Sequence, residues 1–198
     1  MPRRSEDAPA PAVRAHYLSL AWSALEAGDP SLAARARQCL ADSRAELERA
    51  RGLQWLPIEH LLAMSELAFE LGGAECTRAL VLDTMGAALG SPLWGRILRM
   101  TIGAFGLGPA AVVRWAPGVY RLAFRGTGAM RVPQQAPGRA EVVFEGVPPQ
   151  CLAAEPYLAA LGYALEYFLV LTERQGSVTL LGCEEGRVRY LVQYALPD

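Results

Sequence analysis

The stretch RAEVVFEGVPPQCLAAEPYLAALGYALEYFLVLTERQGSVTLLGCEEGRVRYLVQY, residues 139–194, decides the fold. Its first part, residues 139–146, alternates polar and apolar side chains with the period of a half-buried strand. Pro148 and Pro149 end this strand, because proline has no N–H to donate to a sheet. From Ala154 onward apolar residues recur at steps of three and four, which predicts a helix of about five turns.

The last two apolar runs, residues 177–183 and 187–195, predict a β-hairpin that completes the sheet. The short loop Glu184-Glu185-Gly186 joins them, and its glycine suits a bulge or a left-handed turn residue. On the second run valine and tyrosine occupy one face, whereas arginine, leucine and glutamine occupy the other. This pattern predicts an antiparallel sheet with one covered face and one wetter face.

Gly162 interrupts the predicted helix and costs about 1 kcal/mol relative to alanine in a helix interior. Two interpretations are open: a tolerated substitution without consequence, or a close approach of the helix backbone to a sheet or to a partner helix. We favour the close approach.

Helical patterns fill the first part of the chain, and proline or glycine separates most of them. A strand over 126–132 and a turn over 133–138 then lead into the stretch quoted above. We therefore predict an α+β fold, an N-terminal helical bundle packed on a small four-stranded antiparallel sheet in the order helices, strand, strand, helix, strand, strand. The predicted helices cover residues 13–27, 29–51, 55–72, 74–89, 92–105 and 109–124.

The domain organisation follows from the same pattern. Residues 1–12 are charged and rich in proline, and we expect them to be disordered. Residues 13–198 form one domain, in which 13–53 can serve as an interaction arm. The helix over 29–51 has a strongly charged side that is either simply solvated or a surface for a protein partner.

Composition excludes several classes of function. A net charge of −1 provides no field that would attract nucleic acid or an anionic membrane. The longest uncharged run, residues 100–113, is shorter than the roughly twenty residues of a membrane span, and no secretory signal is visible. We expect a cytoplasmic protein whose four scattered cysteines are buried free thiols rather than disulfides.

Residues for catalysis or metal binding are scarce. His16 and His60 are the two histidines, and neither lies near a cysteine in the sequence or within an H-E-x-x-H motif. There is no G-x-S-x-G motif, and the glycines of residues 103–108 have the wrong spacing for a dinucleotide loop. The sequence thus favours a protein that is not an enzyme and that holds no metal or cofactor.

Aromatic and aliphatic residues of the predicted helices form the candidate site. They either fill the core or form the walls of an apolar pocket between the helix over 92–105 and the helix that follows Ala154, with the sheet as its floor. The candidate pocket residues are Trp94, Ile97, Phe105, Trp115, Leu161, Tyr163, Leu165 and Phe168.

Trp55-Leu56-Pro57 before a helix, the Gly108-Pro109 break, and the strand–helix–strand–strand order of residues 142–194 resemble an uncharacterised protein family found chiefly in myxobacteria. The resemblance covers roughly residues 30–195. That family is similar to a wider group of 4-vinyl-reductase-like domains, haem-nitric-oxide-binding domains and TRAPP trafficking subunits. The resemblance implies a domain that binds a small apolar ligand or a lipid, or that dimerises.

The haem-binding members of this wider group use a proximal histidine together with a tyrosine, serine and arginine motif. Here Tyr17-Leu18-Ser19 is followed by Leu20, so the arginine is missing, and no histidine occurs after His60. The resemblance therefore does not extend to haem.

The 4-vinyl-reductase-like domains often carry two cysteines in their last hairpin. Cys183 matches the first, but Tyr190 stands about where the second would fall. We therefore expect no metal at this hairpin.

Two functional hypotheses remain. The first is a non-enzymatic ligand-binding or sensory domain that acts through protein contacts and takes a small apolar ligand or a lipid. The second is a structural dimerisation or adaptor module with a filled core, which would form a homodimer or bind a protein partner through its helical half. An enzyme ranks third, because its site would have to be built from arginine, glutamate and tyrosine alone.

Overall fold

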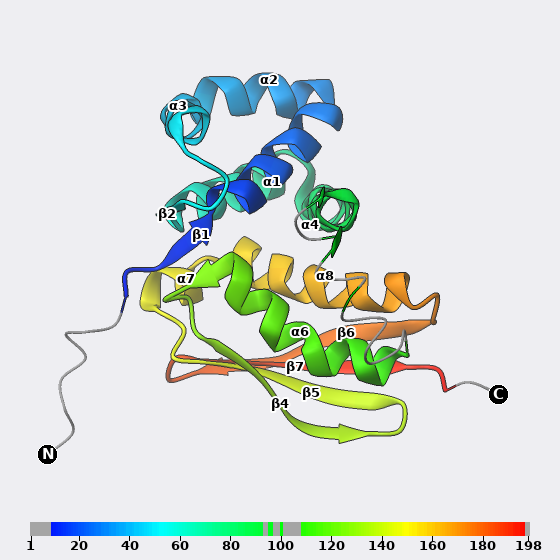
Figure 1. Cartoon of the computed structure of the whole chain (residues 1–198). Helices are drawn as coiled ribbons and strands as arrows, with labels where there is room; N and C mark the ends of the chain where they lie inside the picture. Colours follow the sequence, from blue (N-terminus) through cyan, green and yellow to red (C-terminus); the bar gives the residue numbers. More distant parts are fainter. Residues whose placement is uncertain (1–8, 93–94, 97–99, 101–107, 197–198) are drawn as a thin grey trace, which may run out of the picture.

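A computed structural model describes residues 9–92, 95–96, 100 and 108–196. Two helices lie across one face of an antiparallel sheet, and a second group of helices packs on top of them (Figure 1). This arrangement confirms the predicted α+β class and the bundle of helices on a small sheet. The helices are α1 (Ala15–Ala27), α2 (Pro30–Cys39), α3 (Ala41–Arg49), α4 (Glu59–Gly90), α6 (Pro109–Ala123), α7 (Pro149–Ala153) and α8 (Glu155–Leu171).

The larger sheet has four antiparallel strands in the order β4-β5-β7-β6. Its hairpin of β6 and β7 closes at Glu185 and Gly186, whose φ angles of 47° and 77° are the left-handed turn conformations that the sequence predicts. Val188, Tyr190 and Val192 are buried beneath the helices, which confirms the covered face. The strands are β4 (Ala129–Ala136), β5 (Arg139–Glu145), β6 (Gly176–Glu184) and β7 (Arg187–Tyr194).

The opposite face of this sheet carries charges of both signs on neighbouring strands. Glu145 of β5 accepts ion pairs from Arg131 of β4 at 2.8 Å and from Arg187 of β7 at 3.2 Å. Glu141 pairs with Arg189 at 3.4 Å. Cross-strand pairs of opposite charge are the favourable arrangement on an exposed sheet face.

Strand β4 is longer than the sequence predicts. It continues to Ala136 through Pro133, where a turn was expected, and its register with β5 shifts between Arg131 and Gln134. Proline is compatible with this strand because β4 lies at the edge of the sheet, where an N–H facing away from the ladder is not needed.

A second sheet of three very short strands was not predicted. It has the order β2-β1-β3 and is antiparallel, so the motif around Trp55 begins with a strand rather than a helix. The guanidinium of Arg14 lies 3.7 Å from the ring centroid of Trp55, and that of Arg125 lies 5.0 Å from it, so one residue of each strand joins a cation–π stack. The strands are β1 (Ala12–Arg14), β2 (Trp55–Pro57) and β3 (Phe124–Arg125).

Residues 9–12 lie against the domain, although the sequence assigns them to a disordered lead-in. The carbonyl of Pro11 accepts a hydrogen bond from the N–H of Ile58 at 3.1 Å. A Cβ on Gly126 would come within 2.2 Å of the carbonyl oxygen of Pro9, so the chain crosses this glycine closely.

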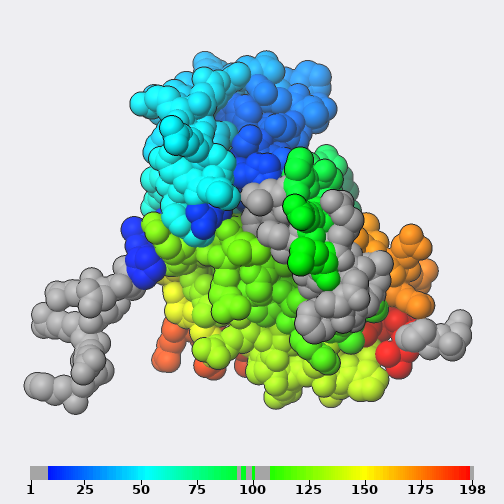
Figure 2. Space-filling view, in the orientation of Figure 1, coloured from blue at the N-terminus to red at the C-terminus, as the bar shows by residue number. Residues whose placement is uncertain are grey.

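The helical half differs from the prediction at two points. The single helix expected over 29–51 is two helices, α2 and α3, that meet at Leu40. The helices expected on either side of Gly73 form α4, which has a kink at this glycine (φ 63°, ψ −154°). In Figure 2, α2 and α3 gather at one end of the molecule, at the opposite end from the sheet. No helix in the described part of the chain is long and apolar enough to cross a membrane.

Helix α8 lies directly on the sheet, and Gly162 is the point of close approach. A Cβ on Gly162 would lie 3.3 Å from the Cε1 atom of Tyr190. The Tyr190 hydroxyl donates a hydrogen bond of 2.6 Å to the carbonyl of Leu158 on the same helix, so the ring is held in place. This geometry agrees with the second interpretation of Gly162.

We expect Gly162→Ala to lower the free energy of unfolding by roughly 1 kcal/mol despite the better helix propensity of alanine, because the held Tyr190 ring cannot withdraw freely. Gly118→Ala in α6 is the matched control, since a Cβ there meets nothing within 4 Å and alanine should stabilise the helix. Urea denaturation measures both changes. A stabilising Gly162→Ala would contradict the close approach.

Candidate functional site

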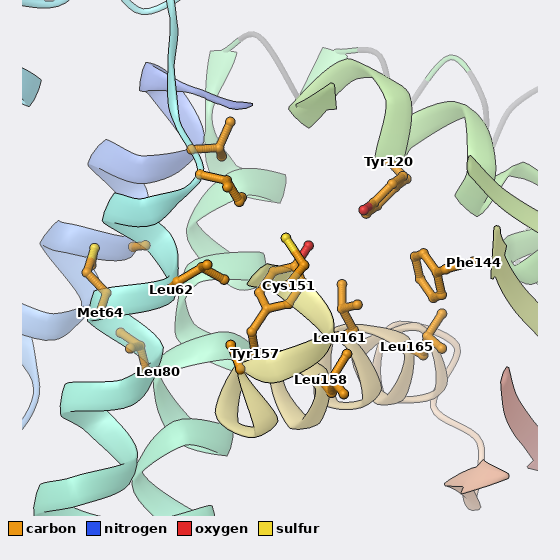
Figure 3. Packing of buried hydrophobic residues seen from close by; sticks show 14 of the residues in the cluster. Leu62, Met64, Leu80, Tyr120, Phe144, Cys151, Tyr157, Leu158, Leu161 and Leu165 are labelled. Atoms are coloured by element: carbon orange, nitrogen blue, oxygen red, sulfur yellow. The ribbon is translucent and has the colours of Figure 1, made fainter. Parts of the chain in front are cut away.

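An apolar cavity lies between the two halves of the molecule. It has a volume of about 110 Å³ and is bounded by α1 and α4 on one side and by α6, α8 and the sheet on the other. Figure 3 shows part of its surroundings, with Tyr120 coming from α6, Phe144 from β5 and a row of leucines from α8. The lining residues from the helical half are Tyr17, Ala21, Leu61, Met64, Ser65, Leu80, Val81, Thr84, Met85, Ala88 and Leu89.

Aromatic rings in edge and stacked contact form the wall between the cavity and the sheet. Tyr120 stacks on Phe124 with ring centroids 4.7 Å apart and meets Phe144 edge-on at 5.2 Å. Trp115 and Phe168 meet edge-on at 5.7 Å on the α6–α8 side. Such pairs stabilise the core beyond the area they bury, and they fix the shape of the cavity wall.

Three tyrosines bring hydroxyl groups into this apolar environment. The Tyr120 hydroxyl is 2.8 Å from the Thr127 Oγ1 atom, and the side chains of Tyr120 and Tyr157 point toward each other in Figure 3. Burial raises the pKa of Tyr120 and of Tyr17 to about 12. Burial also raises the pKa of Tyr157 well above its ordinary value, with a further contribution from the nearby Tyr120. All three therefore remain neutral near pH 7.

Two buried polar atoms of lining residues have no hydrogen-bond partner in the described part of the chain. They are the Tyr157 hydroxyl oxygen and the Trp115 Nε1 atom. The Tyr157 hydroxyl is close enough to Tyr120 to perturb its pKa, but it makes no hydrogen bond of normal distance and angle. Buried polar groups without partners are uncommon in folded proteins, so these two mark the cavity as a candidate binding site.

The candidate pocket residues from the sequence divide into three sets. Trp115, Leu161, Leu165 and Phe168 line the cavity. Tyr163 lies instead beside a groove between α8 and β6, on the other side of the helix. Residues 94, 97 and 105, where the sequence places Trp94, Ile97 and Phe105, lie outside the described residues.

The sequence did not single out Tyr120 or Tyr157 as site residues, and Tyr17 entered only as the tyrosine of the incomplete haem-type motif. Each sits in an apolar helical stripe, where a tyrosine is indistinguishable by spacing from any other core residue. The signal that could have found them is chemical: a tyrosine hydroxyl normally needs a hydrogen-bond partner when its ring is buried.

His60 belongs to a separate polar cluster. Its Nδ1 atom lies 2.8 Å from the Ser43 hydroxyl, and its Nε2 atom lies 2.9 Å from the Glu46 carboxylate. Ser43 and Glu46 are three residues apart on α3, so they share the face that meets α4. These residues line neither the cavity nor the groove beside α8, and the cluster acts as a link between α3 and α4.

The cysteines are all free, as expected, but they are not all buried. Cys151 is buried, Cys76 is half-buried, and Cys39 and Cys183 are exposed. Cys183 pairs with Val188 across the hairpin, while Tyr190 lies opposite Leu180. Among the described residues no group of three or more histidine, cysteine or acidic side chains is placed to hold a metal ion.

Comparison with known proteins gives a fold. No family model matches the sequence, and no curated protein matches it. The fold is similar to that of solved H-NOX structures. One is an Fe(II) unliganded H-NOX protein from K. algicida, with a TM-score of 0.64 and 6% identity, covering 93% of this chain and 97% of that chain.

Two further structures have the same fold. A mutant H-NOX from T. Tengcongensis aligns with a TM-score of 0.59 at 11% identity, covering 93% of this chain and 98% of that chain. An oxygen-binding H-NOX domain described as related to soluble guanylate cyclases, in its oxygen complex, aligns with a TM-score of 0.50 at 11% identity, covering 92% and 93%. At these identities the similarity shows the fold alone. The resemblances to the myxobacterial family and to 4-vinyl-reductase-like domains stay predictions.

The described lining of the cavity does not fit haem. Histidine or cysteine commonly holds haem iron, and the described lining contains neither. Tyrosine can also be a ligand, but as a tyrosinate, and burial opposes loss of the proton from Tyr17, Tyr120 and Tyr157. The described lining also has no arginine to pair with the carboxylates of haem.

The buried thiol and phenols predict a loss of stability at alkaline pH. Burial raises the pKa of Cys151 from 9.0 to about 11 and that of Tyr120 from 10.0 to about 12. The unfolded chain therefore loses these protons first. The free energy of unfolding therefore keeps its full value below pH 9. It falls as the pH rises through the pKa values of the folded protein, about 11 for the Cys151 thiol and about 12 for the Tyr120 phenol.

Urea titrations from pH 8 to pH 11 should show this fall, and Cys151→Ala should remove about 1–2 kcal/mol of it between pH 9 and pH 11. Cys39→Ala, at an exposed thiol, is the control and should leave the pH dependence unchanged. A slope unaffected by Cys151→Ala would show that the thiol is not desolvated.

Proposed function

We propose that this protein is a non-enzymatic ligand-binding domain of a sensory kind, and that its cavity takes a small apolar molecule. The observation that carries the proposal is the cavity itself: an apolar space of about 110 Å³ between two halves of a chain whose fold is similar to that of H-NOX structures. Sites of this kind are lined by hydrophobic and aromatic side chains with a few placed polar groups. The described lining has this composition.

The structures with a similar fold include an Fe(II) H-NOX protein and an oxygen-binding H-NOX domain, so the shared fold supports a ligand site between these helices. The chemistry of the site is this chain's own, and it favours contact with an apolar ligand over coordination of haem iron. Residue Ala21 of α1 reaches the cavity, and α1 also packs on α2. A ligand in the cavity would therefore contact α1, and a shift of α1 on binding would reach α2.

Protein contacts of the helical half belong to this proposal. The charged residues of α2 and α3 pair largely within the chain: Glu26 accepts from Arg37 at 3.1 Å and from Arg44 at 3.2 Å. This observation agrees better with a solvated surface than with a charged docking face. A homodimer through the helical half stays a prediction from the sequence, and light scattering of the full chain at micromolar concentration tests it.

Two neighbouring alanines of α8 give a matched test of the cavity. Ala160 lines the cavity, whereas Ala159 lines the groove on the other side of the helix. Ala160→Leu should reduce binding of the neutral fluorescent probe N-phenyl-1-naphthylamine by at least tenfold, because the added methyl groups occupy the binding space. Ala159→Leu should bind it as the unmodified chain does.

The readout is a fluorescence titration, with thermal unfolding to show that both variants fold. Equal binding by the two variants would place the probe elsewhere and contradict the proposal. Extraction of the purified protein with organic solvent, followed by mass spectrometry, would then identify any ligand that it retains.

A further inference from the structure

Tyr157 lines the cavity with a hydroxyl that makes no hydrogen bond of normal distance and angle, although the side chain of Tyr120 lies close to it. Tyr157 is 1% exposed, and its hydroxyl oxygen has no hydrogen-bond partner in the described part of the chain. Trp115, a second lining residue, likewise has an unpartnered buried N–H. Each such group has lost its hydration without gaining a hydrogen bond in return, which is unfavourable. A ligand that supplies the missing partner removes this penalty.

Three other described hydroxyls of the lining already take part in hydrogen bonds, and those of Tyr17 and Tyr167, which also line the cavity, are not among the buried polar atoms without a partner. The hydroxyls of Ser65 and Thr84 donate to carbonyls of their own helix, at 3.0 Å and 2.7 Å. Tyr120 shares its hydrogen bond with Thr127. The Tyr157 hydroxyl and the Trp115 indole N–H are available to a ligand. Both can donate a hydrogen bond, and the indole N–H can only donate. A ligand with a hydrogen-bond acceptor therefore matches the cavity.

The lack of charged side chains in the described lining limits which ligands can bind. No arginine, histidine or acidic residue is among the described lining residues. A carboxylate or an ammonium group would lose its hydration here without gaining a counter-ion, which is costly. Burial keeps the Tyr157 phenol protonated near pH 7 by raising its pKa, so the phenol can donate and offers no negative charge. The ligand must therefore be uncharged.

We infer that the ligand is an uncharged, largely apolar molecule that carries a carbonyl-type oxygen and accepts a hydrogen bond from the Tyr157 hydroxyl. This inference rests on the proposed function, because it names the ligand class of the same cavity. Ketones, aldehydes and esters of aromatic or aliphatic compounds have this chemistry. Free acids and amines do not, and neither do pure hydrocarbons.

Three naphthalene probes of similar size test the inference with the full chain. They are 2-acetylnaphthalene, which is neutral and has a carbonyl, 2-isopropenylnaphthalene, which replaces that oxygen by carbon, and 2-naphthoate, which is charged. Equilibrium dialysis gives the dissociation constant of each for the unmodified protein and for Tyr157→Phe. For each probe the ratio of the two dissociation constants is taken, so the different hydrophobicities of the probes cancel.

Tyr157→Phe should weaken binding of 2-acetylnaphthalene by about tenfold and leave 2-isopropenylnaphthalene within twofold, since a single hydrogen bond of typical strength is lost for the ketone alone. The charged 2-naphthoate should bind the unmodified protein at least tenfold more weakly than the ketone. An equal effect of Tyr157→Phe on the ketone and the hydrocarbon overturns the inference, as does tight binding of 2-naphthoate.

Tyr157→Phe is expected to fold, because it removes a hydroxyl that has no hydrogen-bond partner in the described part of the chain. A second measurement needs no variant: the carbonyl stretching frequency of bound 2-acetylnaphthalene should lie below its value in hexane. A frequency equal to that in hexane overturns the inference. If the three probes and N-phenyl-1-naphthylamine all fail to bind the unmodified protein, the proposed function itself is wrong. If the hydrocarbon binds and the ketone binds no better, the inferred ligand class is wrong, but the cavity is still a binding site for apolar molecules.

Discussion

The contact between Gly162 and the ring of Tyr190 sets the position of α8, and the rest of the domain is arranged around that helix. Glycine lets the helix backbone approach the sheet, and the bond from Tyr190 to the carbonyl of Leu158 holds helix and strand together. Helix α4 then packs on the outer side of α8, where Arg78 pairs with Glu166. One face of α8 therefore fits closely, and the other faces the space between the two halves.

That space persists because the second face of α8 carries small residues. Ala160 and Ala164 line the cavity beside Leu161 and Leu165, so the helix packs against α4 without filling the gap completely. Voids larger than a water molecule are few in protein interiors, and the proposed ligand site rests on finding an apolar one bordered by unpaired donors. The fold provides the position of this site, and a few side chains decide what it accepts.

The regular elements of the fold could be predicted from the sequence, because each has a clear hydrophobic period. The two-residue alternation of β5 and β7 and the glycine of the hairpin loop were sufficient for the sheet. The three-stranded sheet could not be predicted, since strands of two or three residues have no measurable period, and the stacking of Arg14 on Trp55 joins residues far apart in the sequence. The break at Leu40 was also missed, because neither glycine nor proline marks it.

The candidate site was predicted in part for a similar reason. Leu161, Leu165 and Phe168 follow a helical stripe, and all three line the cavity in the structure. Tyr163 is two residues from Leu161, a rotation of about 200° around the helix, which places it on the opposite side. Whether the hydroxyl of Tyr157 finds a partner depends on three-dimensional neighbours, and no sequence pattern reports it.

The ladder of arginine and glutamate on the uncovered sheet face has a consequence for assembly. Glu145 lies between Arg131 and Arg187, so each side chain of the ladder already has an opposite charge beside it. If a second sheet stacked on this surface, the paired arginine and glutamate side chains would lose their hydration without gaining a new ion pair, which is unfavourable. The face is thereby protected against sheet-on-sheet aggregation, and it can remain in water while the opposite face encloses the cavity.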